Sequence, residues 1–227
     1  MTDKQTSHLL ADKQKLTEAA TVAAAMKAER RSQAERRDEA EQRLLKAAVA
    51  LVAERGLERV TLADVGEAAG YSRGLPAHYF GSKSGLIVTL ASHLVEGFGR
   101  ALVRVEHHAP GLERLLGTVA FYLDSARKDP VGTRALFVLL GDGLSNDLIR
   151  GQLAELNARS VGAFETNLAA AIKSGEVRSD IDARAQAILI LAGLRGAVSQ
   201  WLLAPRAINL SAVRDEMTAS LRRSLAA

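Results

Sequence analysis

Residues 61–83 have the pattern of two short helices joined by a tight turn, and this pattern constrains the fold more than any other feature of the chain. The hydroxyl of Thr61 can cap the free backbone N–H groups of a helix start, and apolar residues at helical spacing follow it. Gly70 predicts the end of that helix, because glycine adopts the left-handed backbone of helix ends at low cost. Ser72 is predicted to cap the second helix. The pattern therefore predicts a helix-turn-helix motif, in which the second helix enters the major groove of DNA.

The same segment carries residues in an order and spacing typical of one known family: Thr61, Asp64-Val65, Ala69-Gly70, Ser72-Arg73-Gly74, His78-Tyr79-Phe80, Ser82-Lys83 and Leu86. Over roughly residues 39–90 the chain resembles the N-terminal domain of TetR-family transcriptional regulators. The resemblance implies an all-α protein, with an N-terminal three-helix helix-turn-helix DNA-binding domain and a C-terminal helical ligand-binding and dimerisation bundle. It also implies a homodimeric repressor whose partners are a double-stranded DNA operator and a small-molecule effector.

The second helix departs from the family pattern at Leu75-Pro76-Ala77, where the family has a small apolar residue followed by Leu-Tyr. The aromatic contact usually expected at the third position is therefore absent. With Ser72 as the cap, Pro76 falls within or just after the first helical turn, where a missing N–H costs least. We expect the helix to form, but its base preference cannot be inferred from relatives.

The predicted DNA contacts lie in and around this second helix. Arg73 and His78 are candidates for base edges, since an arginine fork can meet guanine bidentately, although Arg73 could equally hold the backbone. Tyr79 could donate its hydroxyl to a phosphate or simply pack. Lys83 follows a predicted N-cap, Ser82, so its ammonium and the N-terminus of the helix could bind the same DNA phosphate. The alternative is a solvated surface lysine. The full predicted set is Thr61, Ser72, Arg73, Gly74, Leu75, His78, Tyr79 and Lys83.

The charge of the chain is unevenly distributed. The net charge is +4, yet residues 38–86 hold six Arg or Lys against seven Asp or Glu. The positive charge lies just upstream, in a predicted partly disordered or helical extension over residues 1–37. Such a segment could follow the phosphate backbone or enter the minor groove, or it could be a solvated tail. The arginines of this possible DNA arm are Arg30, Arg31, Arg36 and Arg37.

Composition favours a helical protein of the cytoplasm. Aromatic residues make up 4% of the chain, and 48% of it is hydrophobic, which fits an Ala/Leu-rich helical fold better than a sheet. There is no cysteine, so no disulfide and no thiolate metal site is possible. No apolar stretch reaches the ~18 residues that a membrane span needs, so we expect no membrane partner.

Helix signals continue along the chain. A first domain helix is predicted over residues 39–55, ended by Gly56, and Gly66 is expected where two helices pack closely. Asp129-Pro130, Asn146 and Ser211 are predicted starts of later helices. These helices span residues 83–106, 111–128, 130–140 and 146–173. Another begins at Asp180 or Asp182 and ends at Pro205, and the last spans residues 211–225. The domains predicted from this order are residues 38–86 for DNA binding and 87–227 for effector binding and dimerisation.

Two late helices carry much apolar surface. The segment 185–203 is apolar on more than one face, and the last helix carries a single apolar stripe, so both could meet their copies in a homodimer, although a purely internal packing role is the alternative. The predicted interface residues are Leu189, Leu191, Val198, Leu202, Met217 and Leu221.

Large side chains spread over successive helices could line an apolar cavity, although each could also be ordinary core. We expect a small, largely hydrophobic effector there. The resemblance implies that it would shift the linker helix over residues 83–106 and change the separation of the two reading helices. The predicted pocket residues are Phe98, Leu102, Phe121, Phe137, Phe164 and Trp201.

Enzyme motifs are lacking. Neighbouring His107 and His108 would point apart on a helix, Gly141-Asp142-Gly143 lacks the spacing of a calcium loop, and no glycine-rich phosphate loop or nucleophile elbow is present. We therefore expect no catalytic residue, no metal and no cofactor. The alternative function is a helical ligand-binding or architectural protein whose altered reading helix recognises no specific operator.

Overall fold

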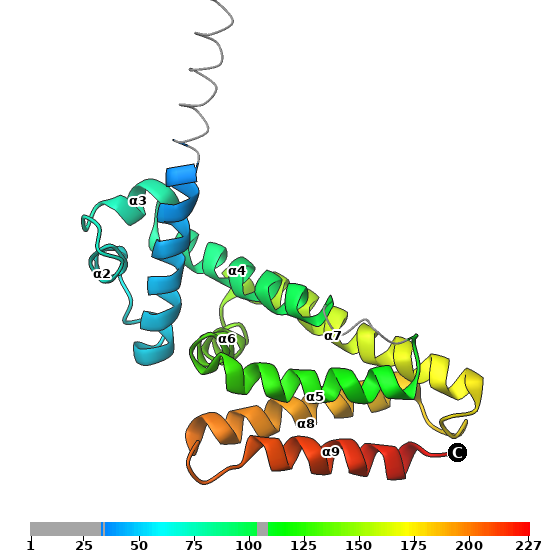
Figure 1. The fold of residues 1–227 in the computed structure, drawn as a ribbon. Coiled ribbons are helices and arrows are strands. Elements are labelled where there is room, and N and C mark those ends of the chain that lie inside the picture. The colour runs from blue at the N-terminus through cyan, green and yellow to red at the C-terminus, as the bar shows by residue number, and fades with distance from the viewer. Residues whose placement is uncertain (1–32, 34, 104–108) are drawn as a thin grey trace, which may run out of the picture. The chain divides into compact units, whose positions relative to one another are not determined.

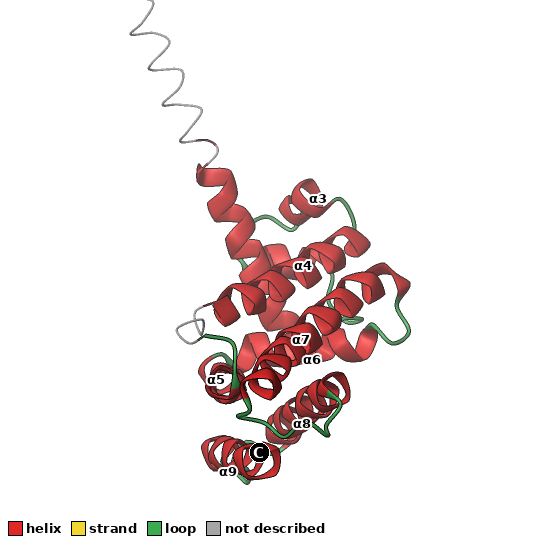
Figure 2. Cartoon of the chain, turned by 90° about the vertical axis from the view of Figure 1, so that its right-hand side faces the viewer, coloured by secondary structure: helices red, strands yellow, loops and turns green. Residues whose placement is uncertain are grey.

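The computed structural model describes residues 33, 35–103 and 109–227, and of residues 98–103 it describes the backbone alone. The chain divides into two units between Leu44 and Leu45. The described residues are helices joined by turns, with one isolated bridge between Val177 and Ala226 (Figures 1 and 2). The all-α fold class is confirmed.

The N-terminal part consists of a helix over residues 35–55, α2 (Leu62–Ala68) and α3 (Leu75–Phe80). Two glycines end the first two helices in the left-handed conformation, Gly56 at φ 78° and Gly70 at φ 77°, as predicted. Apolar residues of the first helix are buried, among them Leu44, Leu45, Ala48, Leu51 and Val52.

The remaining helices begin and end close to their predicted positions because their caps are strong. Asp129, Asn146 and Asp182 each accept backbone N–H groups at the start of a helix. The last helix is capped by Asn209 and not by Ser211, whose own N–H is one of the capped donors. The helices are α4 (Lys83–Val103), α5 (Leu112–Lys128), α6 (Pro130–Asp142), α7 (Asp147–Ser174), α8 (Ala183–Leu203) and α9 (Leu210–Leu225).

The C-terminal core is formed where α5 packs against α7, α8 and α9. Its centre consists of leucines with almost no exposed surface, among them Leu115, Leu168 and Leu194. Helix α8 is, in the described part of the chain, the one helix long and apolar enough to cross a membrane. Its inner face is buried in this core.

Helix α4 connects the helix-turn-helix region to this core. It packs against α6 and α7, and Gln152 of α7 donates its amide Nε2–H to the hydroxyl of Ser92 at 3.0 Å. Residues 104–106 of the predicted linker lie outside the described residues. The predicted domain boundary at residues 86/87 falls inside α4, where Leu86 is buried, so no break in the helix marks it.

The turn between α2 and α3 depends on a close backbone approach at Gly66, as predicted. A Cβ atom there would lie 2.5 Å from the carbonyl oxygen of Ser72 and 3.1 Å from Cδ of Pro76. Because the nearest atom belongs to the backbone, any side chain at this position would push the two helices apart.

We therefore expect Gly66→Ala to lower the free energy of unfolding by roughly 1–3 kcal/mol. Urea denaturation followed by circular dichroism measures this. Gly74→Ala is the matched control, since nothing lies within 4 Å of its Cβ and its φ of −85° suits alanine. Equal midpoints for the two variants would contradict the close approach.

Candidate functional site

The start of α2 is fixed by a reciprocal pair of hydrogen bonds. The hydroxyl oxygen of Thr61 accepts from the N–H of Asp64 at 3.2 Å, and the carboxylate of Asp64 accepts from the N–H of Thr61 at 3.0 Å and from its hydroxyl at 2.6 Å. These bonds lower the pKa of Asp64, with a smaller contribution from the charges of Arg55 and Arg73. Thr61 is confirmed as the cap, and its hydroxyl proton is already held by Asp64.

The start of α3 differs from the prediction. Its N-cap is Gly74, with no side-chain cap, whereas Ser72 lies in the preceding turn and its carbonyl accepts from the N–H of Leu75 at 3.1 Å. Pro76 is in the first helical turn, as predicted. A proline there removes one of the N–H groups that a capping side chain would bind, so a serine cap gains little at this helix.

The predicted contact residues of α3 differ in exposure. Arg73 and His78 are exposed, together with Ser72 and Gly74, while Leu75 and Tyr79 are half-buried. The Tyr79 ring lies edge-on to His78, with ring centroids 5.8 Å apart. Phe80 is buried, as expected for the anchor of this short helix. The polar side chains of the reading helix are thus accessible to a partner.

Lys83 begins α4 directly beyond α3. The hydroxyl of Ser82 accepts from the N–H of Gly85 at 3.1 Å, which confirms Ser82 as the cap of α4. The ammonium of Lys83 donates to the carbonyl of Glu58. A phosphate contact by Lys83 would therefore have to replace or share this bond.

The predicted arm is described only in part. Arg30 and Arg31 lie outside the described residues. Arg36 and Arg37 are exposed in the first turns of the helix over residues 35–55.

Two cavities lie beside α6. The first, about 230 Å³, lies between α4, α5 and α6 and has both apolar walls and polar groups, including His93, Tyr122 and Thr133. The second, about 570 Å³, lies between α6, α7 and α8. Phe137 lines both.

The predicted effector pocket needs correction. Of its members only Phe137 lines either of these cavities. Phe164 is buried in the core around α5, and Trp201 packs against that core. Phe121 lines neither cavity, and the side chains of Phe98 and Leu102 lie outside the described residues.

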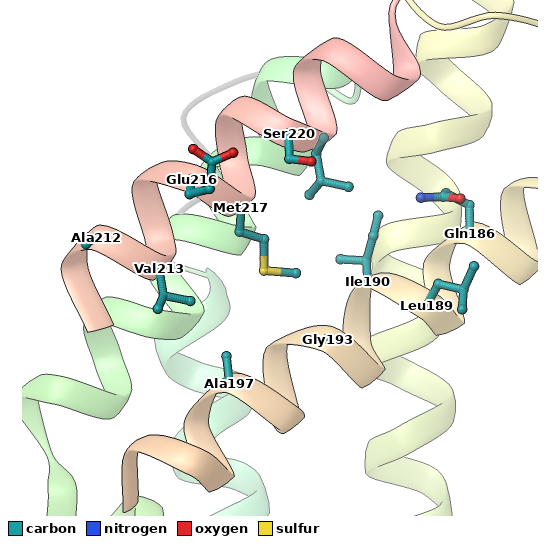
Figure 3. A pocket seen from close by; sticks show the side chains of 11 residues that line it. Gln186, Leu189, Ile190, Gly193, Ala197, Ala212, Val213, Glu216, Met217 and Ser220 are labelled. Carbon is teal, nitrogen blue, oxygen red and sulfur yellow. The ribbon is translucent and has the colours of Figure 1, made fainter. Parts of the chain in front are cut away.

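A third hollow is an open groove of about 680 Å³ between α8 and α9. Figure 3 shows Leu189 and Ile190 on α8 facing this space, with the Met217 side chain reaching toward α8 from α9. Leu189 is 65% exposed.

The predicted dimer interface also needs correction. Leu191, Val198 and Leu202 are buried in the chain's own core and do not line the groove. Leu221 is nearly buried but borders it, beside Leu189 and Met217. Each buried leucine or valine stands on the inner face of its helix, a distinction that composition could not make.

A short reading helix on a close-packed α2, joined by one long helix to an all-helical domain with internal cavities, defines a helix-turn-helix regulator. Comparison with known families agrees. Residues 44–90 match the family model for bacterial regulatory proteins of the tetR family, and residues 111–226 match the C-terminal model of BetI-type transcriptional repressors. The chain belongs to the TetR family of transcriptional regulators.

Curated relatives are transcriptional regulators as well. The HTH-type transcriptional regulator BetI of Serratia proteamaculans is 30% identical over 122 residues, which are 52% of this chain and 61% of that protein. BetI of Brucella abortus is 36% identical over 78 residues, 34% of this chain and 39% of that protein. The matches thus cover less than two thirds of these relatives.

Solved structures share the fold. A transcriptional regulator from Saccharomonospora viridis in complex with choline has a TM-score of 0.75 at 22% identity, covering 84% of this chain and 99% of that one. FadR from Bacillus subtilis in complex with stearoyl-CoA has a TM-score of 0.69 at 20% identity, covering 82% and 99%.

The capping pair at α2 predicts a pH effect. Because the pKa of Asp64 is lowered in the folded chain, its contribution to stability is present above the pKa of the unfolded chain and is lost as the pH falls through the folded pKa. We expect Thr61→Ala to raise the pKa of Asp64 in an NMR titration. Thr89→Ala is the control, because the Thr89 hydroxyl donates to the carbonyl of Gly85 within α4, and the pKa of Asp64 should be the same as in wild type. An unchanged pKa in Thr61→Ala would refute the stated cause.

Proposed function

We propose that this chain is a sequence-specific, homodimeric repressor of the cytoplasm that binds a palindromic operator and is released by a small, largely hydrophobic effector. The observation that carries the proposal is α3, with Arg73 and His78 exposed beside the N-terminus of α4, where Lys83 stands. This arrangement provides base-reading donors and a phosphate-binding helix end on one short stretch of chain.

The geometry supports a DNA role for each predicted residue. In this proposal Arg73 and His78 read base edges in the major groove, and Tyr79 and Lys83 hold the phosphate backbone. Thr61, Ser72, Gly74 and Leu75 complete the surface, and Arg30, Arg31, Arg36 and Arg37 follow the backbone upstream.

The groove between α8 and α9 supports a homodimer. Leu189 is 65% exposed on α8 and its neighbour Ile188 is 49% exposed, more than a soluble monomer favours for neighbouring large side chains. Gly193 leaves room for Met217, since a Cβ there would lie 3.2 Å from the methionine Cε. A second copy is the proposed occupant, because a two-fold protein with two reading helices matches a palindromic operator.

The cavity between α4, α5 and α6 supports effector control. His93, Leu94 and Gly97 line it from α4, the helix that starts next to α3. An occupant that prefers one position of α4 would shift the equilibrium between DNA-competent and DNA-incompetent dimers. Choline and stearoyl-CoA, named for two structural neighbours, differ in charge and size, so they do not select an effector for this chain.

The alternative function is a helical ligand-binding or architectural protein without a specific operator. It is favoured by the uncapped start of α3 at Gly74 and by Pro76 in its first turn. Such a protein would bind DNA weakly and without sequence preference.

Operator selection from random duplexes separates the two functions. At near-physiological salt with excess competitor DNA, we expect the purified protein to enrich one palindrome. No enrichment by a folded dimer, with the effector cavity shown to be empty by denaturing extraction, would favour the alternative.

On the selected operator, Lys83→Gln should weaken binding to all sequences alike and reduce the magnitude of the salt slope by about one. Arg73→Gln should instead relax the preference at one base position. Lys173→Gln, an exposed lysine at the end of α7, is the control. An unchanged salt slope in Lys83→Gln would refute the phosphate role.

Leu189→Asp should convert the dimer to monomers in sedimentation velocity, because the carboxylate would be buried without a partner. Leu144→Asp, at an 83% exposed leucine outside the groove, should leave the dimer intact. A dimer that persists in Leu189→Asp would exclude this groove as the interface.

A further inference from the structure

Arg195 of α8 has no carboxylate partner among the described residues, unlike Arg184 and Arg214. Its Nη1 donates to the side-chain oxygen of Asn157 at 2.8 Å. Its Nε is buried and has no hydrogen-bond acceptor among the described residues. A buried donor on a charged group without an acceptor is costly, and such a group marks a position where an acceptor is missing.

Other arginines of the C-terminal bundle form ion pairs with carboxylates. Arg184, on the same helix, lies 3.1 Å from a carboxylate oxygen of Glu165, and Arg214 lies 2.9 Å from one of Asp124. Within the described residues no acidic side chain forms such an ion pair with Arg195.

Arg195 lines the cavity of about 570 Å³ between α6, α7 and α8. Phe137, Leu140 and Leu153 provide apolar wall, and no acidic side chain is among the residues that line it. Arg150 also lines this cavity, but it is paired with Asp147 at 2.6 Å. The cavity therefore combines an apolar wall with one positive charge that the protein leaves uncompensated.

This cavity shares a lining residue, Phe137, with the one beside α4. Burial raises the pKa of Tyr122, and the charge and hydrogen bond of Arg195 act on it in the opposite direction, so the two side chains are neighbours. Tyr122 lines the cavity between α4, α5 and α6, and Phe137 lines both cavities. A molecule held at Arg195 would therefore lie next to the side chains that border α4.

We propose that the cavity between α6, α7 and α8 binds an amphipathic carboxylate, with its carboxylate group at the guanidinium of Arg195 and its apolar chain against Phe137, Leu140 and Leu153. An arginine fork matches two carboxylate oxygens, and such charge-assisted bonds are about twice as strong as neutral ones. An alkylammonium would meet an uncompensated cation. The ligand's role as effector rests on the proposed function, but the binding site does not.

The first test compares head groups on the wild-type full chain. Isothermal titration calorimetry is run with straight-chain carboxylates from butanoate to dodecanoate below their micelle concentrations, and with alcohols and trimethylammonium compounds of matching length. We expect at least one carboxylate to bind at least about tenfold more tightly than both matched compounds. If no carboxylate binds, or if the matched alcohol or ammonium binds equally well, the proposal is overturned.

The second test places the binding at Arg195. Arg195→Gln should weaken the best carboxylate at least about tenfold and leave the matched alcohol unchanged. Arg184→Gln, on the same helix but paired with Glu165 and outside the cavity, should bind as the wild type does. Circular dichroism melting confirms that each variant folds. Equal carboxylate affinity in Arg195→Gln and wild type would remove the site from this cavity.

The carboxylate site and the repressor function can be refuted independently of each other. Adding the best carboxylate to the protein on its selected operator should release the DNA in wild type and not in Arg195→Gln. Tight carboxylate binding that leaves operator affinity unchanged would keep the site but refute its role as the effector site. An absence of any selected operator would refute the repressor function without touching the calorimetric result.

Discussion

The unbroken hydrogen bonding of α4 is the constraint on which the other parts of this protein depend. The helix begins at Lys83, against the end of α3, and its later turns pack on α6 and α7. Gly85 is required in its first turn, because a Cβ there would lie 2.0 Å from the carbonyl oxygen of Phe80. The same helix belongs to the helix-turn-helix region and to the C-terminal bundle, with no flexible linker between them. A displacement of α4 at the cavity between α4, α5 and α6 is therefore transmitted along the helix to α3.

The reading helix is too short to be stable alone, so its position is set by its neighbours. Gly66 lets the turn at Ser72 and Pro76 approach α2 closely, and buried Phe80 anchors the other end of α3. These contacts explain why a helix with a proline and without a side-chain cap keeps its place. They also leave Arg73 and His78 accessible, since the packing uses the opposite face.

The C-terminal helices meet two different demands. Their inner faces fill one core around α5, and their ion pairs, such as Arg214 with Asp124, fix the surface. Arg195 departs from this pattern, because no carboxylate among the described residues pairs with its charge beside an apolar cavity. Departures of this kind concentrate where a protein binds another molecule, since a ligand can supply the missing group.

The sequence by itself determined the helical class, most helix ends, the helix cap at Thr61 and the close packing at Gly66, because caps, glycines and periodicity act between residues near in the chain. Only the tertiary structure decided which apolar residues are core, since Val198 and Leu189 look alike in sequence but stand on opposite faces of α8. The same holds for Phe164, predicted in a pocket and found in the core, and for Arg195, which the motif analysis passed over. Whether a side chain lacks a partner depends on residues far away in the chain, and local patterns carry no information about them.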